Sequence, residues 1–375
     1  MKKALVLLWA VLILSTGVSA VEVAAPSALL MEKETGTVLF AKDEHAKLEP
    51  ASVTKVMTIL LTMEAIDSGA LSYDTMITAS AHACSMGGSQ IWLKENEQMS
   101  VSDLLKAVCV VSANDCAVAL GEAISGSEDA FVERMNQRAK ELGMNDTTFK
   151  NATGLPADGH VSSAYDIALM SRELMLRHPT ITKFTTIWMD TVRDGAFGLS
   201  NTNKLVRFYP GATGLKTGFT SNAGYCLSAT AQRDGLGLIA VVMGAKTSQE
   251  RFAGCKNMLD YGFANYALIK PRLSADNPIP VKLGTKDFVN AIPAEDIKLL
   301  LDKSQKEQVT TEITLDEAAT APVSKGQKLG TLTVRAGEQV LAQVPMIASE
   351  AIPALSWWQL FLQVLQQLSM SKPTN

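Results

Sequence analysis

Cysteine and histidine are scarce in this chain of 375 residues, which holds five cysteines and four histidines. The cysteine count is odd and most of them lie in apolar stretches, so buried free thiols are expected in place of a disulfide framework. None has the spacing of metal ligands, and four histidines give a zinc site little to build on. We therefore expect neither a metal nor a cofactor. The cysteines are Cys84, Cys109, Cys116, Cys226 and Cys255.

An excess of positive charge is absent as well. The 34 Lys and Arg residues are outnumbered by 38 Asp and Glu residues, for a formal net charge of −4. A nucleic-acid-binding domain carries a basic patch or stripe, so no nucleic acid is expected as a partner. Hydrophobic and charged shares of 47% and 19% are those of an ordinary globular protein, and the length leaves room for two domains.

The N-terminal apolar run is too short to span a membrane comfortably. Two lysines precede it, it covers residues 4–14, and the small-residue stretch Val18-Ser19-Ala20 follows. A basic start, an apolar middle and a small-residue exit are typical of a signal peptide, so residues 1–20 are predicted to be removed after Ala20. Because no cysteine follows the run, a lipoprotein anchor is not expected. The mature protein is predicted to work outside the cytoplasm.

Hydrophobic periodicity predicts one antiparallel sheet assembled from both ends of residues 21–270, with a helical lobe between. A helix over about residues 51–67 is apolar on nearly all sides and is expected at the centre of the lobe. The expected strands cover residues 27–31, 37–41, 224–232 and 236–243. The other expected helices cover residues 101–111, 115–124, 130–142, 164–176 and 248–266.

The composition changes near residue 270. Short runs rich in valine and threonine, separated by Gly, Pro and Asp, predict a small all-β domain over residues 271–350, interpreted as a spacer or interaction module. Residues 351–375 hold an amphipathic helix with paired tryptophans, Trp357 and Trp358. Tryptophans favour an interface, so the helix is expected to lie on a membrane surface. Docking on the protein itself or in a dimer is the alternative.

Ser52 and Lys55 form a Ser-x-x-Lys motif at the start of the apolar helix. A serine hydroxyl needs a base within hydrogen-bond reach to become a nucleophile, and residues three apart share one helix face. Lysine can be that base only if burial or a neighbouring cation lowers its pKa; the apolar helix supplies burial and Lys216 the cation. The alternative is a capping serine beside a solvated lysine.

Ser112 and Asn114 flank Ala113 at the junction of two helical runs. A hydroxyl there could pass a proton to a leaving group, and a carboxamide could hold a substrate backbone amide. The alternative is an N-cap for the helix that starts near Asp115, a position that suits serine and asparagine.

Lys216, Thr217 and Gly218 occur together on an expected edge strand. An ammonium and a hydroxyl facing a cleft would bind a carboxylate, and a glycine would let a substrate backbone approach. The alternative is a solvent-facing strand with a turn glycine.

These three motifs, in this order, make the chain resemble the serine D-alanyl-D-alanine carboxypeptidases among the low-molecular-mass penicillin-binding proteins. The resemblance extends over about residues 22–350. It implies an α/β (α+β) transpeptidase fold of the penicillin-binding-protein and β-lactamase type, an antiparallel sheet with a helical lobe. Arg251 falls where the family has an arginine that helps to hold the substrate carboxylate, and the oxyanion hole is expected from the backbone N–H groups of Ser52 and Phe219. Further segments that fit are residues 88–93, 149–155 and 160–166.

Two positions depart from the family pattern. Ala113 replaces a usual glycine, which is a mild change, and Phe219 stands where some relatives carry histidine. Only the backbone N–H is needed at residue 219, so activity is expected to survive.

The resemblance implies release of the terminal D-alanine from peptidoglycan stem peptides through a Ser52 acyl-enzyme. Lys55 would be the base and Ser112 would help to protonate the departing D-alanine. Asn114, Lys216, Thr217, Gly218, Phe219 and Arg251 would bind the substrate. β-Lactams would acylate Ser52, and the tail helix would hold the enzyme on the outer face of the cytoplasmic membrane.

Three other functions are alternatives to this interpretation. A serine β-lactamase shares the motifs, but its deacylating glutamate would have to be Glu173, which is expected to be an ordinary helix residue. A non-catalytic wall-binding or β-lactam-sensing module is the second alternative. Such a module would not need its catalytic residues, whereas every catalytic residue type is present in this chain. A Ser-His-Asp hydrolase would have to use His160 or His178, and His178 is expected at a helix end.

Overall fold

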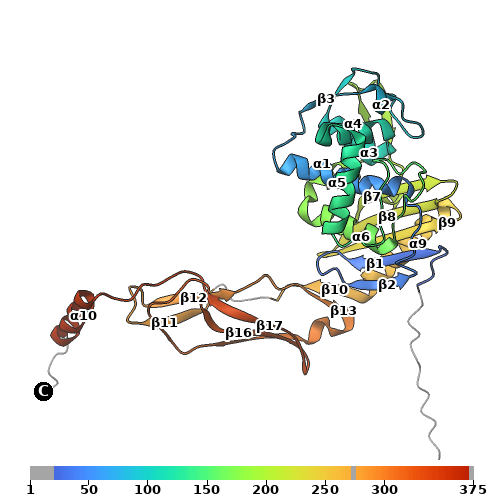
Figure 1. Ribbon diagram of the computed structural model, residues 1–375. Coiled ribbons are helices and arrows are strands. Elements are labelled where there is room, and N and C mark those ends of the chain that lie inside the picture. The colour runs from blue at the N-terminus through green and yellow to red at the C-terminus, as the bar shows by residue number, and fades with distance from the viewer. Residues whose placement is uncertain (1–20, 272–275, 371–375) are drawn as a thin grey trace, which may run out of the picture.

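The computed structural model describes residues 21–271 and 276–370, so the predicted signal peptide lies outside the described residues. The chain forms a rounded N-terminal part, an elongated β-rich part and a helix at the far end of the molecule (Figure 1).

A five-stranded antiparallel sheet organises the N-terminal part, with the strand order β2-β1-β9-β8-β7. Both ends of this part contribute to it, since Ser27 on β1 lies opposite Met243 on β9. The predicted sheet is thereby confirmed, and β7, which carries Lys216, is at its edge. The strands are β1 (Ser27–Glu32), β2 (Val38–Lys42), β7 (Ala212–Thr220), β8 (Gly224–Arg233) and β9 (Leu236–Ala245).

Two hydrophobic cores lie on opposite faces of the sheet, because successive side chains of a strand point to opposite sides. Leu29 and Met31 of β1 belong to the core shared with the helical lobe. Ala28 and Leu30 belong to the second core, beneath α9. Burial on both faces explains why β1 is a continuous apolar run.

The buried central helix begins with a tight 3₁₀ turn, η1 (Ala51–Thr54), and continues as α1 (Lys55–Asp67). The predicted helix is therefore correct in extent, but its first turn is wound more tightly than expected. The helices around it are α2 (Ala81–Cys84), α3 (Val101–Val111), α4 (Asn114–Ser125), α5 (Glu128–Glu141), α6 (Ala164–Arg177), η2 (Pro179–Ile181), α7 (Thr182–Thr185), α8 (Leu205–Phe208) and α9 (Ser248–Asn265). Two small two-stranded antiparallel sheets complete the lobe, β3 (Met76–Thr78) with β4 (Gln98–Ser100) and β5 (Met189–Val192) with β6 (Phe197–Ser200).

The β-rich part contains a six-stranded sheet of order β14-β16-β17-β12-β11-β15 and a two-stranded sheet of β10 and β13. Leu332, Val334 and Met346 are buried between its strands. An all-β part was predicted, but its valine- and threonine-rich runs do not include β10, β12, β13 or β15. The elements are β10 (Tyr266–Ile269), β11 (Pro278–Lys282), β12 (Phe288–Pro293), β13 (Leu299–Asp302), η3 (Lys303–Gln308), β14 (Val309–Leu315), β15 (Ala319–Thr320), β16 (Lys328–Ala336) and β17 (Gln339–Ala348).

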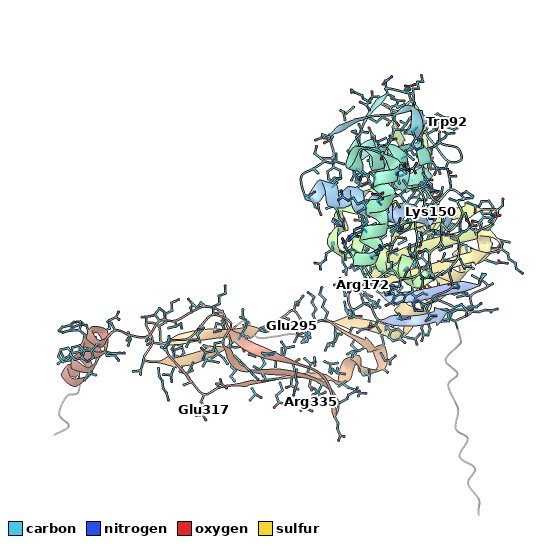
Figure 2. The ribbon with its side chains drawn as sticks, viewed as in Figure 1. Trp92, Lys150, Arg172, Glu295, Glu317 and Arg335 are labelled. Carbon is cyan, nitrogen blue, oxygen red and sulfur yellow. The ribbon has the colours of Figure 1, made fainter. Side chains whose placement is uncertain are left out.

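A direct ion pair joins the two parts of the chain. Lys298 Nζ lies 2.7 Å from Glu34 Oε2 in the turn between β1 and β2. Arg172 on α6 braces the same turn through the carbonyl oxygens of Lys33 and Glu34. In Figure 2 the labels of Arg172 and Glu295 mark the two sides of this junction.

The terminal helix α10 (Trp357–Met370) stands apart from the rest of the molecule (Figure 1). Trp357 and Trp358 are 70% and 67% exposed, and Phe361 and Leu362 are exposed too. No helix in residues 21–271 or 276–370 combines the length and the apolar character needed to cross a bilayer.

Candidate active site

The 3₁₀ turn brings Ser52 directly over Lys55. Lys55 Nζ lies 2.9 Å from Ser52 Oγ and donates a hydrogen bond to the carbonyl oxygen of Thr153 at 2.7 Å. Lys55 is fully buried, and no side-chain cap at the start of η1 or α1 uses Ser52. The alternative of a capping serine beside a solvated lysine is therefore wrong.

Burial lowers the pKa of Lys55 well below its usual value. The charge of Lys216 lowers it further, and the carboxylate of Asp115 opposes both effects. Because a desolvated ammonium beside a second cation loses its proton easily, Lys55 has the properties of a base. The sequence motif predicts this arrangement, including the contribution of Lys216.

The loop beneath Ser52 positions the Thr153 carbonyl, a group that the sequence analysis did not single out. Asn151 Oδ1 accepts hydrogen bonds from the backbone N–H groups of Thr153 and Gly154. Gly154 has φ +80°, and a Cβ there would lie 1.8 Å from the carbonyl oxygen of Ala51. Only glycine fits this close approach. The Asn-Ala-Thr-Gly stretch within residues 149–155 was the available signal.

Ser112 and Asn114 each have one buried polar side-chain atom that makes no hydrogen bond within the described residues. Ser112 ends α3 in the left-handed region with φ +66°, and Asn114 opens α4. Asn114 Nδ2 donates to the carbonyl oxygen of Gly87 at 2.6 Å. Among the described residues, Ser112 Oγ and Asn114 Oδ1 are buried atoms without a partner. Such atoms are rare in native proteins and point to a ligand.

The N-cap alternative for this motif is wrong. Ala113 occupies the N-cap position of α4, and no side chain caps the helix there. Ser112 Oγ and Asn114 Oδ1 are therefore free for another use.

Lys216 and Thr217 are buried on β7, so the alternative of a solvent-facing strand is wrong. Lys216 Nζ donates to the carbonyl oxygen of Thr217 at 2.9 Å, and Thr217 Oγ1 lies 2.7 Å from Thr202 Oγ1. Burial lowers the pKa of Lys216 to about 7; Cys109 opposes this effect and the nearby charge of Arg251 adds to it. An anion bound beside Lys216 would raise this pKa and restore the ammonium.

Gly218 differs from the expectation. A Cβ at this position would lie 2.9 Å from the carbonyl oxygen of Pro50 and 3.0 Å from the nitrogens of Ser52 and Val53. The missing side chain thus lets β7 pack on the turn that carries Ser52. The sequence predicted instead that this space is filled by the substrate backbone. The correction follows from the 3₁₀ turn, which brings the backbone of residues 50–53 against β7.

Arg251 lies on α9 behind β7 and β8. Its Nη1 donates to the carbonyl oxygens of Gly218 at 3.0 Å and Cys226 at 3.3 Å, and its Nε is a buried atom without a partner among the described residues. The guanidinium also lies over the rings of Tyr225 and Phe252. These contacts hold the two strands together at the level of Gly218.

The histidines do not complete a Ser-His-Asp triad with Ser52. His178 Nδ1 lies 2.6 Å from Asp67 Oδ2, but Asp67 is the last residue of α1, at the opposite end from Ser52. His160 Nε2 lies 2.9 Å from Thr54 Oγ1, and burial lowers its pKa to about 4.

Glu173 has a structural partner. Arg138 Nη2 on α5 donates to Glu173 Oε1 at 2.7 Å, and Arg138 Nε donates to Glu64 Oε1. The carboxylate of Glu173 therefore links α6 to α5. This agrees with the expectation that Glu173 is an ordinary helix residue.

The five cysteines are all free thiols, and four of them are buried. This agrees with the expectation of free thiols in apolar surroundings.

Comparison with known proteins gives a consistent result over nearly the whole chain. The family described as D-alanyl-D-alanine carboxypeptidase (peptidase family S11) matches residues 15–247, and the C-terminal domain of penicillin-binding protein 5 matches residues 272–354. The D-alanyl-D-alanine carboxypeptidase DacF of Bacillus subtilis is 46% identical over 332 residues, which are 87% of this chain and 85% of that protein.

Solved structures extend the comparison to the fold. Penicillin-binding protein 5 of Haemophilus influenzae is 30% identical with a TM-score of 0.75, covering 88% of this chain and 98% of that one. Penicillin-binding protein D2 of Listeria monocytogenes, solved in its ampicillin-bound form, is 35% identical with a TM-score of 0.59. That match covers 64% of this chain and 98% of the other.

Proposed function

Since the chain belongs to the D-alanyl-D-alanine carboxypeptidase family, we propose that Ser52 is the nucleophile of this serine hydrolase and Lys55 its base. The enzyme removes the terminal D-alanine from peptidoglycan stem peptides and is acylated by β-lactams. The observation that carries the residue assignment is the 2.9 Å distance between Lys55 Nζ and Ser52 Oγ, with the amine fully buried.

Acylation begins with transfer of the Ser52 proton to the neutral amine of Lys55. Ser52 Oγ attacks the carbonyl carbon between the two D-alanines, and the carbonyl oxygen becomes an oxyanion held by the N–H groups of Ser52 and Phe219. One such donor is worth about 10²–10³ in rate. The C–N bond then breaks, and the proton that Lys55 took from Ser52 passes through Ser112 to the departing amine. The unpartnered Ser112 Oγ supports this role.

Lys216 and Thr217 bind the carboxylate of the terminal D-alanine. An ammonium and a hydroxyl on one buried strand form charge-assisted hydrogen bonds to a carboxylate. Asn114 Oδ1, buried without a partner, accepts a hydrogen bond from a substrate backbone N–H. Arg251 acts through the carbonyl of Gly218 by fixing β7, and its positive charge favours an anion nearby.

Water completes the reaction by releasing the shortened peptide from Ser52. Deacylation of a β-lactam adduct is slow, because Glu173 is engaged by Arg138 and offers no general base to the ester. This observation disfavours a β-lactamase.

Residues 1–20 act as an export signal, and the mature chain divides into a catalytic domain at 21–270, a β domain at 271–350 and a tail at 351–375. The tail helix lies on the outer surface of the cytoplasmic membrane. Exposed Trp357, Trp358 and Phe361 support this location, since aromatic side chains favour the interface.

The test is D-alanine release from a synthetic peptide ending in D-Ala-D-Ala, measured beside covalent labelling by a fluorescent penicillin. Ser52→Ala is expected to abolish both signals. Ser68→Ala, just past the other end of α1, is the matched control and keeps both. Release of D-alanine by the Ser52→Ala protein would overturn the assignment of the nucleophile.

A further inference from the structure

Two fixed points on β7 give the direction in which a bound peptide runs. In the proposed function, Thr217 binds the terminal carboxylate and the N–H of Phe219 binds the oxygen of the scissile carbonyl. The rest of the peptide therefore continues past Phe219 toward the end of β7 at Thr220. Consecutive Cα atoms are about 3.8 Å apart, so the residue before the two D-alanines lies beside the turn at residues 221–223.

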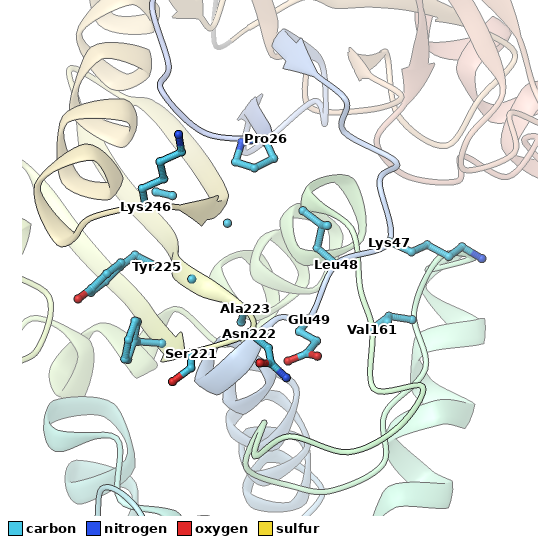
Figure 3. Close-up of a pocket in the computed structure, with 14 residues that line it drawn as sticks. Pro26, Lys47, Leu48, Glu49, Val161, Ser221, Asn222, Ala223, Tyr225 and Lys246 are labelled. Carbon is cyan, nitrogen blue, oxygen red and sulfur yellow. The ribbon is translucent and has the colours of Figure 1, made fainter.

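A cavity of about 690 Å³ opens at this turn (Figure 3). It lies between the β7–β8 turn and the segment 47–49, which leads into the turn that carries Ser52. A volume of this size accommodates a long side chain. The lining includes Glu49, Phe219, Ser221, Asn222, Tyr225 and Lys246.

One side of the cavity is aromatic. The rings of Phe219 and Tyr225 lie 4.3 Å apart, and Phe219 is 53% exposed. An aliphatic side chain passing over these rings would bury apolar surface. The aromatic pair therefore suits the methylene stem of a long side chain.

Glu49 supplies an unpaired negative charge to the same cavity. It is half-buried, and its carboxylate has no hydrogen bond or ion pair within the described residues. Figure 3 shows Glu49 and Asn222 at the same edge of the cavity, while Lys47 points away from it. Lys47 has its own partner, Asp146, at 3.8 Å. The lining of the cavity thus combines an aromatic pair with the carboxylate of Glu49, while Lys246 lines another side.

We propose that this cavity binds the side chain of the diamino residue that precedes D-Ala-D-Ala, with Glu49 accepting a hydrogen bond from its terminal ammonium. The inference rests on the proposed function, because the direction of the peptide comes from the assigned roles of Thr217 and Phe219. Glu49 is a specificity-determining residue: it distinguishes stem peptides with a free side-chain amine from those whose amine is acylated, as it is in a cross-link.

The experiment compares two peptides with the full mature chain. Both are Nα-acetyl-Lys-D-Ala-D-Ala, one with a free side-chain amine and one with that amine acetylated. The measured quantity is the ratio of their kcat/KM values for D-alanine release. A charge-assisted hydrogen bond in a partly buried site predicts a preference of about tenfold for the free amine, expressed mainly in KM.

Glu49→Gln is expected to reduce the ratio to about one. Asp43→Asn makes the same charge change six residues earlier in the chain, at an exposed position outside the cavity, and is expected to keep the wild-type ratio. A wild-type ratio near one, or a ratio that survives Glu49→Gln, would overturn this inference and leave the carboxypeptidase assignment intact. Absence of D-alanine release from both peptides by wild type would instead overturn the proposed function.

Discussion

Gly218 and Ser52 are in direct backbone contact: a methyl group on Gly218 would lie 3.0 Å from the nitrogen of Ser52. The strand that holds the substrate and the turn that holds the nucleophile therefore meet without a side chain between them. The proposed oxyanion hole takes one N–H from each side of this contact, at Ser52 and Phe219. The distance between these two N–H groups therefore depends on the size of the side chain at residue 218.

Gly218→Ala is expected to lower the rate of acylation by about 10²-fold. The added methyl must push β7 away from the turn, which misplaces one oxyanion donor, and one donor is worth about 10²–10³ in rate. The measurement is the second-order rate of labelling by a fluorescent penicillin. Gly198→Ala, where a Cβ meets open space on another strand, is the control and should label normally. Normal labelling of Gly218→Ala would contradict the oxyanion-hole assignment.

The pH dependence of kcat/KM is expected to be bell-shaped. Lys55 must be neutral to act as a base, so kcat/KM rises with pH as the lowered pKa of Lys55 is passed. Lys216 must be charged to bind the carboxylate, so kcat/KM falls above about pH 7, the pKa of Lys216. In kcat the alkaline limb moves to higher pH, because the bound carboxylate raises the pKa of Lys216.

Lys216→Arg tests the origin of the alkaline limb. A guanidinium keeps its charge across this range, so the limb should disappear even though overall activity falls with the changed geometry. The same limb in Lys216→Arg as in wild type would assign it to another group.

His160 is expected to make the fold sensitive to acid. Its folded pKa of about 4 lies below the usual 6.5, so the unfolded chain takes up a proton first as the pH falls. Neutral His160 makes its full contribution to the free energy of unfolding above pH 6.5. This contribution is lost as the pH falls from 6.5 to about 4. At about 1.4 kcal/mol for each pKa unit, the loss approaches about 3 kcal/mol.

The check is urea unfolding of wild type and His160→Gln between pH 7 and 4. The variant is less stable at pH 7, because the contact with Thr54 changes, but its stability should fall less steeply in this window. Parallel curves for the two proteins would show that other groups cause the acid sensitivity.

A chain ending at Leu355 is expected to release D-alanine at the wild-type rate and to lose binding to anionic phospholipid vesicles. This end point keeps the pairing of Ile352 with Val323 and of Leu355 with Leu283, so the β domain stays intact. The measurement is co-sedimentation with vesicles.

Substitutions in the full chain separate membrane contact from the presence of the helix. Replacing Trp357 and Trp358 together by Ala should weaken vesicle binding strongly, because aromatic side chains favour the interface. Gln363→Ala, at an exposed polar position of α10, is the control. Vesicle binding by the chain ending at Leu355 would place the membrane contact elsewhere.

The sequence predicts the central sheet and the buried helix well, because their signals are local. Continuous apolar runs such as β1 and β9 are required when both faces of a strand are covered. A helix that is apolar on nearly all sides has to be central. The three motifs then place Ser52, Ser112 and Lys216 in one site through a family resemblance; their individual roles stay predictions until the variants are measured.

The details that were missed depend on contacts between distant segments. The Thr153 carbonyl reaches Lys55 only because Gly154 packs on Ala51, about a hundred residues earlier in the chain. Gly218 was assigned to substrate because no local pattern indicates what lies opposite it. The short strand β12 alternates in burial, but its exposed positions hold apolar Phe288 and Ile292, so the sequence shows no alternation of apolar and polar residues.

The pairing of β1 with β9 also constrains the order in which the enzyme can be assembled. Residues 27–32 leave the ribosome early, yet their partners at residues 238–243 follow about two hundred residues later. Contacts of such high sequence separation slow folding, because the intervening loop must be closed first. A chain cut before residue 212 would carry Ser52 and Lys55 without β7, β8 or β9. Synthesis of the first two hundred residues therefore yields an apolar, incomplete sheet that carries Ser52 but lacks Lys216, Thr217 and Phe219, the residues proposed to bind the carboxylate and the oxyanion.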